Sequence, residues 1–421
     1  MLIQFSFKNF KSFRDEATLD LSATKISEFN ERVVNVGKER VLPVAAIYGA
    51  NASGKSNVFG AFEYMSLYVI RSLYYADDPE AFANYRPMPF LFDDQSKNAE
   101  SSFEVFFTIP DDNSCKIYNY GFCIGNEGIT EEWLNFKYKT SDKYRNVFYR
   151  SLKEKTLELD GLSDSEKSNI STALEKQVLI ISLGAKLRVD ICKLVYDWFR
   201  TNQIADFASV IPNIVFTRRL SRDFLSDNNY QEKIVKFISS FDESIQGFHV
   251  EEIPSEDEER TYSNYKINTI HKTIGNNNVT EIPITMESAG TLKMITLFPK
   301  LQAILKSGGV FFVDELNARL HPLLLRNVVL TFLNPKLNHS HAQLVFTTHD
   351  AWLLSQDFFR RDEIWFVEKD VNGLSTLYSL ADFVDEDGVK IRKDESYEKN
   401  YLLGKYGAIP NLKTIDILRG N

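Results

Sequence analysis

The feature that most constrains this fold is a glycine-rich segment of eight residues, Gly49 to Ser56. Its sequence, Gly-Ala-Asn-Ala-Ser-Gly-Lys-Ser, matches the pattern GxxxxGK followed by Ser or Thr at every fixed position. The two glycines let backbone N–H groups turn inward around phosphate oxygens, where a Cβ would clash. An apolar run, 41–48, precedes the segment, and apolar positions then recur every three or four residues from Lys55 to about Tyr75. We therefore predict a strand, a phosphate-binding loop and a helix whose N-terminus faces the anion.

Two side chains give this loop its chemistry. Lys55 supplies a positive charge for the β- and γ-phosphates of a nucleotide, and Ser56 offers a hydroxyl to Mg²⁺. The alternative, a glycine turn beside a surface lysine, does not account for the strand and helix on either side. The sequence therefore predicts that ATP and Mg²⁺ bind at this loop.

Two further apolar strands end in polar residues that suit nucleotide hydrolysis. The run 310–313 leads into Asp314 and Glu315, so that Asp314 is placed to orient Mg²⁺ and Glu315 to polarise the attacking water. The run 344–346 leads to His349, which is placed to contact the γ-phosphate or that water. Either pattern alone is as consistent with an ordinary buried strand. Together with the phosphate loop they predict catalytic roles for Lys55, Glu315 and His349.

The remaining pattern predicts an α/β protein interrupted by other structure. Alternating apolar residues predict two strands within 1–21 and antiparallel strands within 100–150. Helical spacing follows over 163–245, without the sustained heptads of a long coiled coil. A hairpin is predicted around 275–278, and helix and strand alternate over 284–350. We divide the chain into an N-terminal ATPase lobe, a helical insertion and a C-terminal ATPase lobe, at 1–160, 161–247 and 248–421.

Composition restricts the environment and the partners. The 421 residues carry a net charge of −9, which excludes a surface coated in positive charge but not a local basic groove. No apolar run reaches the ~18 residues of a membrane span, and the start lacks a signal peptide. The three cysteines, Cys115, Cys123 and Cys192, form no CxxC pair and are expected to be reduced in the cytoplasm. The densest basic cluster, Arg218, Arg219 and Arg222, is either a solvated helix face or a site for nucleic acid, phosphates or an acidic partner.

The motifs, taken in order, resemble the ABC-type ATPase heads of the SMC, RecF and OLD class. The segments that carry the resemblance are Phe7–Phe13, Ala50–Asn57, Glu287–Thr291, Leu320–Pro322 and Thr347–Asp350. The resemblance implies a P-loop fold of the ABC-ATPase head type, with a mixed, largely parallel core sheet, an antiparallel β lobe and a compact helical insertion. It also implies that two protomers enclose ATP between them.

The resemblance assigns further residues to the nucleotide site. In the same protomer it implies contacts from Gly49, Asn51, Ser53, Gly54, Lys55, Ser56 and Asn57, and from Asn9 and Lys11 in the first turn. Ser288 and Gly290 of the signature segment, Glu287–Thr291, are implied to act on the nucleotide of the other protomer. Read without the resemblance, Ser288 is a helix N-cap. The departures are Pro299 inside the predicted signature helix, Arg319 where small polar residues are common, and a glutamine loop for which Gln95 is the candidate.

More narrowly, the chain resembles stand-alone bacterial ATPases of abortive infection and phage defence, such as the ATPase subunit of PARIS-type systems. The segments Pro89–Asp93 and Tyr401–Pro410 carry this resemblance. It implies an ATP-driven switch that controls a separate effector, such as a nuclease toxin. Because few residues follow Val367, we expect no TOPRIM nuclease domain in this sequence. Two alternatives remain open: a DNA-repair ATPase that binds DNA directly, and a module that holds ATP without hydrolysing it.

Overall fold

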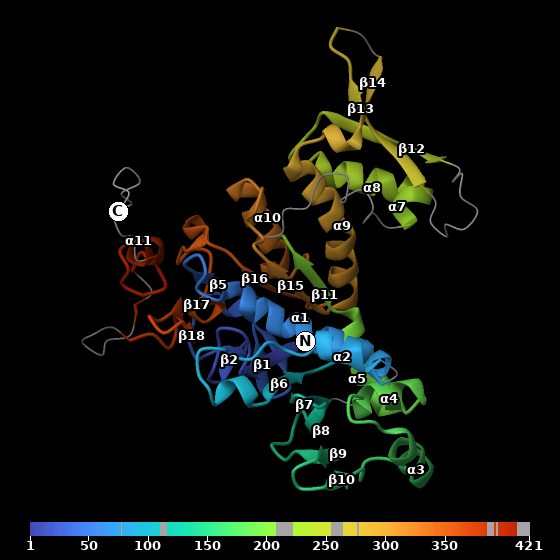
Figure 1. Ribbon diagram of the computed structural model, residues 1–421. Helices are drawn as coiled ribbons and strands as arrows, with labels where there is room; N and C mark the ends of the chain where they lie inside the picture. Colours follow the sequence, from blue (N-terminus) through green and yellow to red (C-terminus); the bar gives the residue numbers. More distant parts are fainter. Residues whose placement is uncertain are drawn as a thin grey trace, which may run out of the picture.

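The protein was examined as a computed structural model that describes residues 1–76, 78–109, 116–207, 222–253, 264–275, 278–384, 391–392 and 395–410. Figure 1 shows a layered α/β body and a smaller lobe that projects from it. Cys115, Arg218 and Arg219 lie outside the described residues, as does the side chain of Arg222.

The centre of the body is a six-stranded sheet in the order β11-β15-β16-β5-β17-β18. Neighbouring strands are parallel from β11 to β17, and β18 pairs antiparallel with β17. The strands β5, β15 and β16 are buried along their whole length, as expected for continuous apolar runs covered on both faces. The strand bounds are Gln203–Asp206 (β11), Val310–Asp314 (β15), Gln343–Thr347 (β16), Val44–Gly49 (β5), Ile364–Lys369 (β17) and Ser375–Ser379 (β18).

Helix α1 (Lys55–Arg71) lies between this sheet and a second one. The Phe62 ring lies 5.3 Å from the Phe312 ring of β15 and 5.3 Å from the Phe5 ring of the second sheet. The opposite face of the core sheet is covered by α9 (Ala289–Ser307) and α10 (Pro322–Leu333), which share a separate apolar cluster with it. Helix α9 continues through Pro299.

The second sheet is antiparallel, with seven strands in the order β10-β9-β8-β7-β6-β1-β2. Gln343 of β16, which is fully buried, connects it to the core: its Nε2 donates to Leu2 O at 2.8 Å and to Leu42 O at 3.0 Å. The strand bounds are Thr156–Glu158 (β10), Arg145–Ser151 (β9), Ile129–Tyr138 (β8), Lys116–Ile124 (β7), Ser101–Phe107 (β6), Leu2–Lys8 (β1) and Ala17–Asp20 (β2); a small ribbon adds β3, Val34–Val36, and β4, Glu39–Val41.

A projecting lobe, which we call the outer lobe, has a core of its own. It contains α7 (Arg222–Ser226), α8 (Asn228–Ile238), β12 (Ile245–Ile253), β13 (Asn264–Lys272) and β14 (Val279–Pro283). The three strands form an antiparallel sheet, and the hairpin predicted around 275–278 is the connection between β13 and β14. Side chains of α8 and of the first turns of α9 pack together in its apolar cluster, so α9 joins the outer lobe to the body (Figure 1).

The helical pattern predicted over 163–245 is wrong at one point. Helices α3 (Asp164–Ala173), α4 (Ile180–Lys186) and α5 (Asp190–Thr201) are followed by the short strand β11, which pairs in parallel with β15. Only four residues form this strand and only one of them is buried, so it carries no local β pattern; its pairing with a strand about a hundred residues away determines its conformation. The three-part division of the chain remains a proposal.

These observations confirm the expected α/β fold, with a largely parallel core sheet and an antiparallel β lobe. Two shorter helices, α2 (Pro79–Asn84) and α11 (Tyr397–Leu402), complete the α-helices of the described residues. Cys123 and Cys192 are buried free thiols, and burial raises the pKa of both. Within the described ranges, no helix has the length and apolar character needed to span a bilayer.

Candidate functional site

The phosphate loop joins β5 to α1, as predicted. Gly54 has a φ of 116°, and a Cβ there would lie 2.6 Å from Ser375 Oγ, so the position requires glycine. Lys55 is only 6% exposed, and its Nζ donates to the carbonyl oxygens of Gly49 at 2.8 Å and Ala50 at 2.9 Å. Burial lowers the pKa of Lys55, and the nearby carboxylates of Glu315 and Asp314 oppose that change. The ammonium therefore lies inside the loop, and both acids are near enough to favour its charged form.

Two serines support this loop from outside. Ser375 Oγ, on β18, lies 2.6 Å from Ser53 O and 2.7 Å from Ser12 Oγ. Asn57 Nδ2 donates to the same Ser12 Oγ at 2.7 Å, and Ser375 N donates to Ser12 O at 2.8 Å. The loop is thereby fixed to the first turn of the chain and to β18. Ser375 is not predictable from the sequence, because a single serine in a short strand has no distinctive pattern.

Asp314 and Glu315 lie where β15 ends, and one threonine of β16 holds both. Asp314 is 2% exposed, and its Oδ1 accepts a hydrogen bond from Thr347 Oγ1. The same Oγ1 accepts from the backbone N–H of Glu315 at 2.8 Å. Because β15 and β16 are adjacent parallel strands, their carboxyl ends bring these groups to one edge of the sheet.

The segment Glu315–Arg319, which we call the acidic-pair loop, leaves the strand abruptly. Its first and last residues both have left-handed backbone angles, with φ of 49° at Glu315 and 61° at Arg319. His349 is exposed and contacts this loop: the Asn317 amide nitrogen lies 3.2 Å from His349 Nε2.

The signature segment packs against the acidic-pair loop. Ser288 caps α9, and its Oγ accepts from Thr291 N at 3.1 Å, as the N-cap prediction requires. A Cβ on Gly290 would lie 2.9 Å from Arg319 O, so the glycine allows close packing of the two segments. None of the hydrogen bonds of the described residues joins Ser288 to the phosphate loop. The role of Ser288 and Gly290 on another protomer's nucleotide stays a prediction.

Two other residues that were predicted to contact nucleotide, Asn9 and Lys11, lie in the first turn of the chain. Asn9 is 3% exposed, and its amide donates to the carbonyl oxygens of Ser96, Ala99 and Glu100 while accepting from Phe90 N at 3.0 Å. Its side chain is therefore committed to segment 90–100. Lys11 is exposed, with its Nζ 5.2 Å from the centre of the Phe10 ring. The contacts of both with nucleotide stay predictions.

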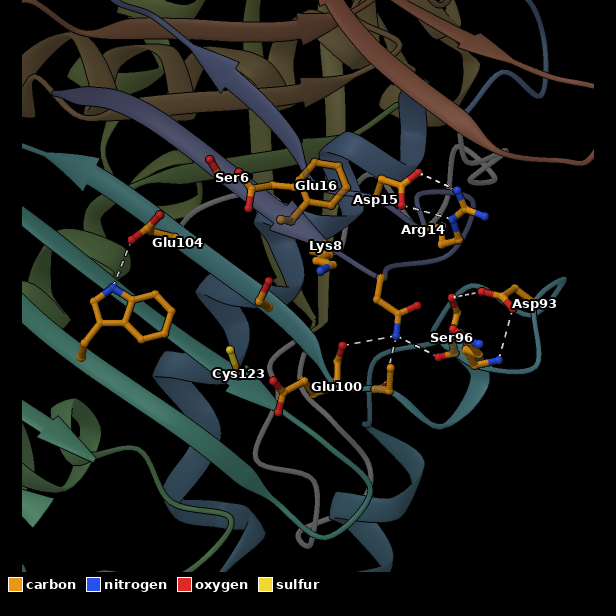
Figure 2. Close-up of a pocket in the computed structure, with 16 residues that line it drawn as sticks. Ser6, Lys8, Arg14, Asp15, Glu16, Asp93, Ser96, Glu100, Glu104 and Cys123 are labelled. Carbon is orange, nitrogen blue, oxygen red and sulfur yellow. Dashed lines mark hydrogen bonds and ion pairs between the residues drawn. The ribbon is translucent and has the colours of Figure 1, made fainter. Parts of the chain in front are cut away.

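Gln95 lines a cavity of about 680 Å³ on the outer side of the antiparallel sheet. Figure 2 shows this cavity, with carboxylates from two rim loops and from β6 around it. The labelled acids are Asp15, Glu16, Asp93, Glu100 and Glu104. The walls of this cavity contain none of Lys55, Asp314 or Glu315, and a role of Gln95 at the nucleotide stays a prediction.

The residues at the phosphate loop fit ATP and Mg²⁺. The Ser53 hydroxyl is buried and has no hydrogen-bond partner among the described residues, which leaves a donor free inside the loop. Asn51 and Ser56 are exposed at the mouth of the loop. The Ser56 hydroxyl and the Asp314 carboxylate are hard oxygen ligands of the kind that Mg²⁺ takes together with substrate phosphates.

Solved structures with a related arrangement are heads of SMC proteins. The SMC head domain from Thermotoga maritima is 14% identical, with a TM-score of 0.41 over 90% of this chain and 98% of that one. An SMC head bound to the C-winged helix domain of ScpA is also 14% identical, with a TM-score of 0.40 over 90% and 97%. A head domain with a coiled coil and joint derived from Pyrococcus yayanosii is 11% identical, with a TM-score of 0.37 over 92% and 98%. No curated protein matches the chain.

The sequence model of one protein family covers most of the chain. It matches residues 44–355, from the strand before the phosphate loop to just past His349. That stretch contains the phosphate loop, the signature segment, the acidic pair and His349 in the order described above. The chain therefore belongs to the family described as AAA domain, putative AbiEii toxin, Type IV TA system.

Proposed function

We propose that this protein is a Mg²⁺-dependent ATPase that works as a cytoplasmic switch. The observation that carries the proposal is the convergence on one sheet edge: Thr347 binds both Asp314 and Glu315, and both carboxylates act on the charge of Lys55. A buried lysine inside a glycine loop, opposite two acids held by one hydroxyl, is an arrangement for phosphoryl chemistry.

The residues divide this chemistry between them. Lys55 and the inward N–H groups of the loop bind the β- and γ-phosphates, with Ser53 as a further donor. Ser56 and Asp314 would hold Mg²⁺, which supplies positive charge to the phosphate oxygens. Glu315 accepts a proton from the attacking water, and His349 orients that water or the γ-phosphate.

We further propose that ATP closes an assembly of this protein with itself. Ser288 is exposed, and so are three large apolar side chains: Met286 at 72%, next to the signature segment in sequence, Leu323 at 61%, in the first turn of α10, and Trp352 at 44%, three positions after His349. Association with a second copy would remove such apolar surface from water, which is favourable. A second copy that covers this face would bring Ser288 and Gly290 to the other nucleotide. Hydrolysis would then reopen the assembly.

The output of the switch is, in our proposal, control of a separate effector, such as a nuclease toxin, in an abortive-infection response. The family description, which names a putative toxin of a toxin–antitoxin system, supports this direction. The net charge of −9 favours a protein partner over bare nucleic acid. ATP-dependent co-purification with the product of an adjacent gene tests the effector. Salt-sensitive DNA binding that strengthens with ATP would instead favour a DNA-repair ATPase.

The variant Glu315→Gln tests the enzymatic core of the proposal. We expect the wild-type protein to hydrolyse ATP with Mg²⁺ and to lose that activity with EDTA. In Glu315→Gln we expect ATP binding to persist and turnover to fall about 10²-fold or more, because the proton acceptor is lost. Glu127→Gln, which neutralises an exposed carboxylate in a different part of the protein, is the matched control. Undiminished hydrolysis in Glu315→Gln would remove the role assigned to Glu315.

A further inference from the structure

A lysine in the signature helix is almost completely buried. Lys293, in the second turn of α9, is 1% exposed. Its Nζ donates to Leu316 O at 2.8 Å and to Ala318 O at 2.6 Å, and lies 4.1 Å from the centre of the Phe207 ring. All three contacts stabilise a cation, and two of them are hydrogen bonds to backbone carbonyl oxygens of the acidic-pair loop.

Burying this ammonium is unfavourable, which makes its position informative. Burial, together with the positive charge of Arg319, lowers the pKa of Lys293 to about 7, although the Glu315 carboxylate opposes the change. Lysine is rarely buried unless it is paired. A neutral apolar residue would fill the same space in the helix without the free-energy cost of removing a charge from water, so packing alone does not explain a lysine here.

The loop that Lys293 binds depends on support from outside. Both of its ends have left-handed backbone angles, at Glu315 and at Arg319, in residues that are not glycine. Such conformations persist only where surrounding contacts determine them. Thr347 binds the start of the loop, whereas Lys293 binds its middle through the carbonyl oxygens of Leu316 and Ala318. Near its end, Arg319 O packs against Gly290.

The helix that carries Lys293 begins at the signature segment. Ser288 is the N-cap of α9, five positions before Lys293. Any displacement of this end of α9 therefore moves the ammonium and the two carbonyls bound to it. Glu315 is the first residue of this loop, so it would be displaced as well.

We propose that Lys293 is a positioning residue that fastens the acidic-pair loop to the signature helix and thereby sets the position of Glu315. This inference rests on the proposed function, and it specifies how that function is regulated. In an assembly of two copies, the signature segment of one copy contacts the nucleotide of the other. Lys293 connects that contact with the Glu315 of its own copy, so that each nucleotide influences hydrolysis of the other.

The variant Lys293→Met tests this role because it removes the ammonium and keeps an unbranched apolar side chain. We expect kcat to fall about tenfold to a hundredfold, because small displacements of a catalytic group have effects of this order. The KM for ATP and the affinity for a fluorescent ATP analogue should stay within about twofold of the wild-type values. Lys306→Met is the matched control, since Lys306 is an exposed lysine at the other end of the same helix. It should behave as the wild-type protein does.

Two outcomes for Lys293→Met would overturn the inference. One is a kcat within about twofold of wild type, and the other is a parallel loss of kcat and nucleotide affinity, which indicates a general structural role. Should Lys293→Met fail to fold, Lys293→Gln, which keeps one N–H donor group, is judged by the same two criteria. If the wild-type protein itself does not hydrolyse ATP, the proposed function fails. If it does and Lys293→Met matches it, only the role of Lys293 fails.

A double variant tests whether Lys293 acts through Glu315. In single-turnover assays, adding Lys293→Met to Glu315→Gln should change the residual rate by less than about twofold, because both substitutions affect one step. If the two effects instead multiply, Lys293 acts elsewhere and the inference is wrong.

Discussion

Thr347 offers the most direct test of how the acidic pair is held. Its hydroxyl donates to Asp314 Oδ1 and accepts from Glu315 N, and the side chain is fully buried. Replacing it with valine keeps the shape and removes both bonds. A bond to a carboxylate contributes about 1.5–3 kcal/mol and a neutral bond about 1 kcal/mol, so about 3 kcal/mol is lost in total. If displacement of the pair raises the activation free energy of hydrolysis by half of that loss, kcat falls about tenfold.

The assay is steady-state ATP hydrolysis together with a thermal melt and nucleotide binding. We expect Thr347→Val to lower kcat and the melting temperature while leaving nucleotide affinity near the wild-type value, since Lys55 is untouched. Thr347→Ser retains the hydroxyl and should recover most of kcat. Thr331→Val removes a threonine hydroxyl that bonds within α10 and serves as the control. Equal kcat for Thr347→Val and wild type would refute the idea that this hydroxyl organises the acids.

Three further predictions address the loop and the stability of the fold. Ser375→Ala removes the contact with Ser53 O, so the KM for ATP should rise several-fold with kcat little changed; an unaltered KM would show that the loop does not need this support. Gly54→Ala places a Cβ 2.6 Å from Ser375 Oγ at a φ of 116°, and ATP-analogue binding should be lost; retained binding would contradict the steric argument. Burial raises the pKa of Glu363 from 4.5 to about 8, so its effect on stability becomes less favourable as the pH rises towards and through 8. Glu363→Gln should therefore melt above the wild type at pH 9, with a smaller difference at pH 5; an equal difference at both pH values would count against this.

The sequence predicted the parts of the site whose chemistry is local. A phosphate loop needs glycine, lysine and serine at fixed spacing, and buried parallel strands appear as continuous apolar runs. Both patterns can be recognised in a single sequence, and β5, α1, β15 and β16 lie where they were expected. The strand β11 has no such signal, because its conformation depends on pairing with β15.

Residues that support the site were harder to predict because their partners are distant in sequence. Ser375 lies 322 positions from the carbonyl it contacts, and Lys293 lies 23 and 25 positions from its two carbonyls. A resemblance gives a residue its place in a motif but not its hydrogen-bond partners. Asn9 illustrates this point: the resemblance implies a place beside the nucleotide, but it does not reveal that the Asn9 amide binds segment 90–100.

The side chain of Gln343 has a consequence for how the protein folds while it is being synthesised. Its amide binds the carbonyl oxygens of Leu2 and of Leu42, 341 and 301 positions earlier. During synthesis at about 5–20 residues per second, the first strands therefore wait roughly 15–70 s for the residue that joins them to the core. Until then the apolar strand β5 has no neighbour on its β16 side, since Leu344 is the first of its partners there. We expect nascent chains that stop before this point to depend on chaperones, whereas longer chains close their core in one late step.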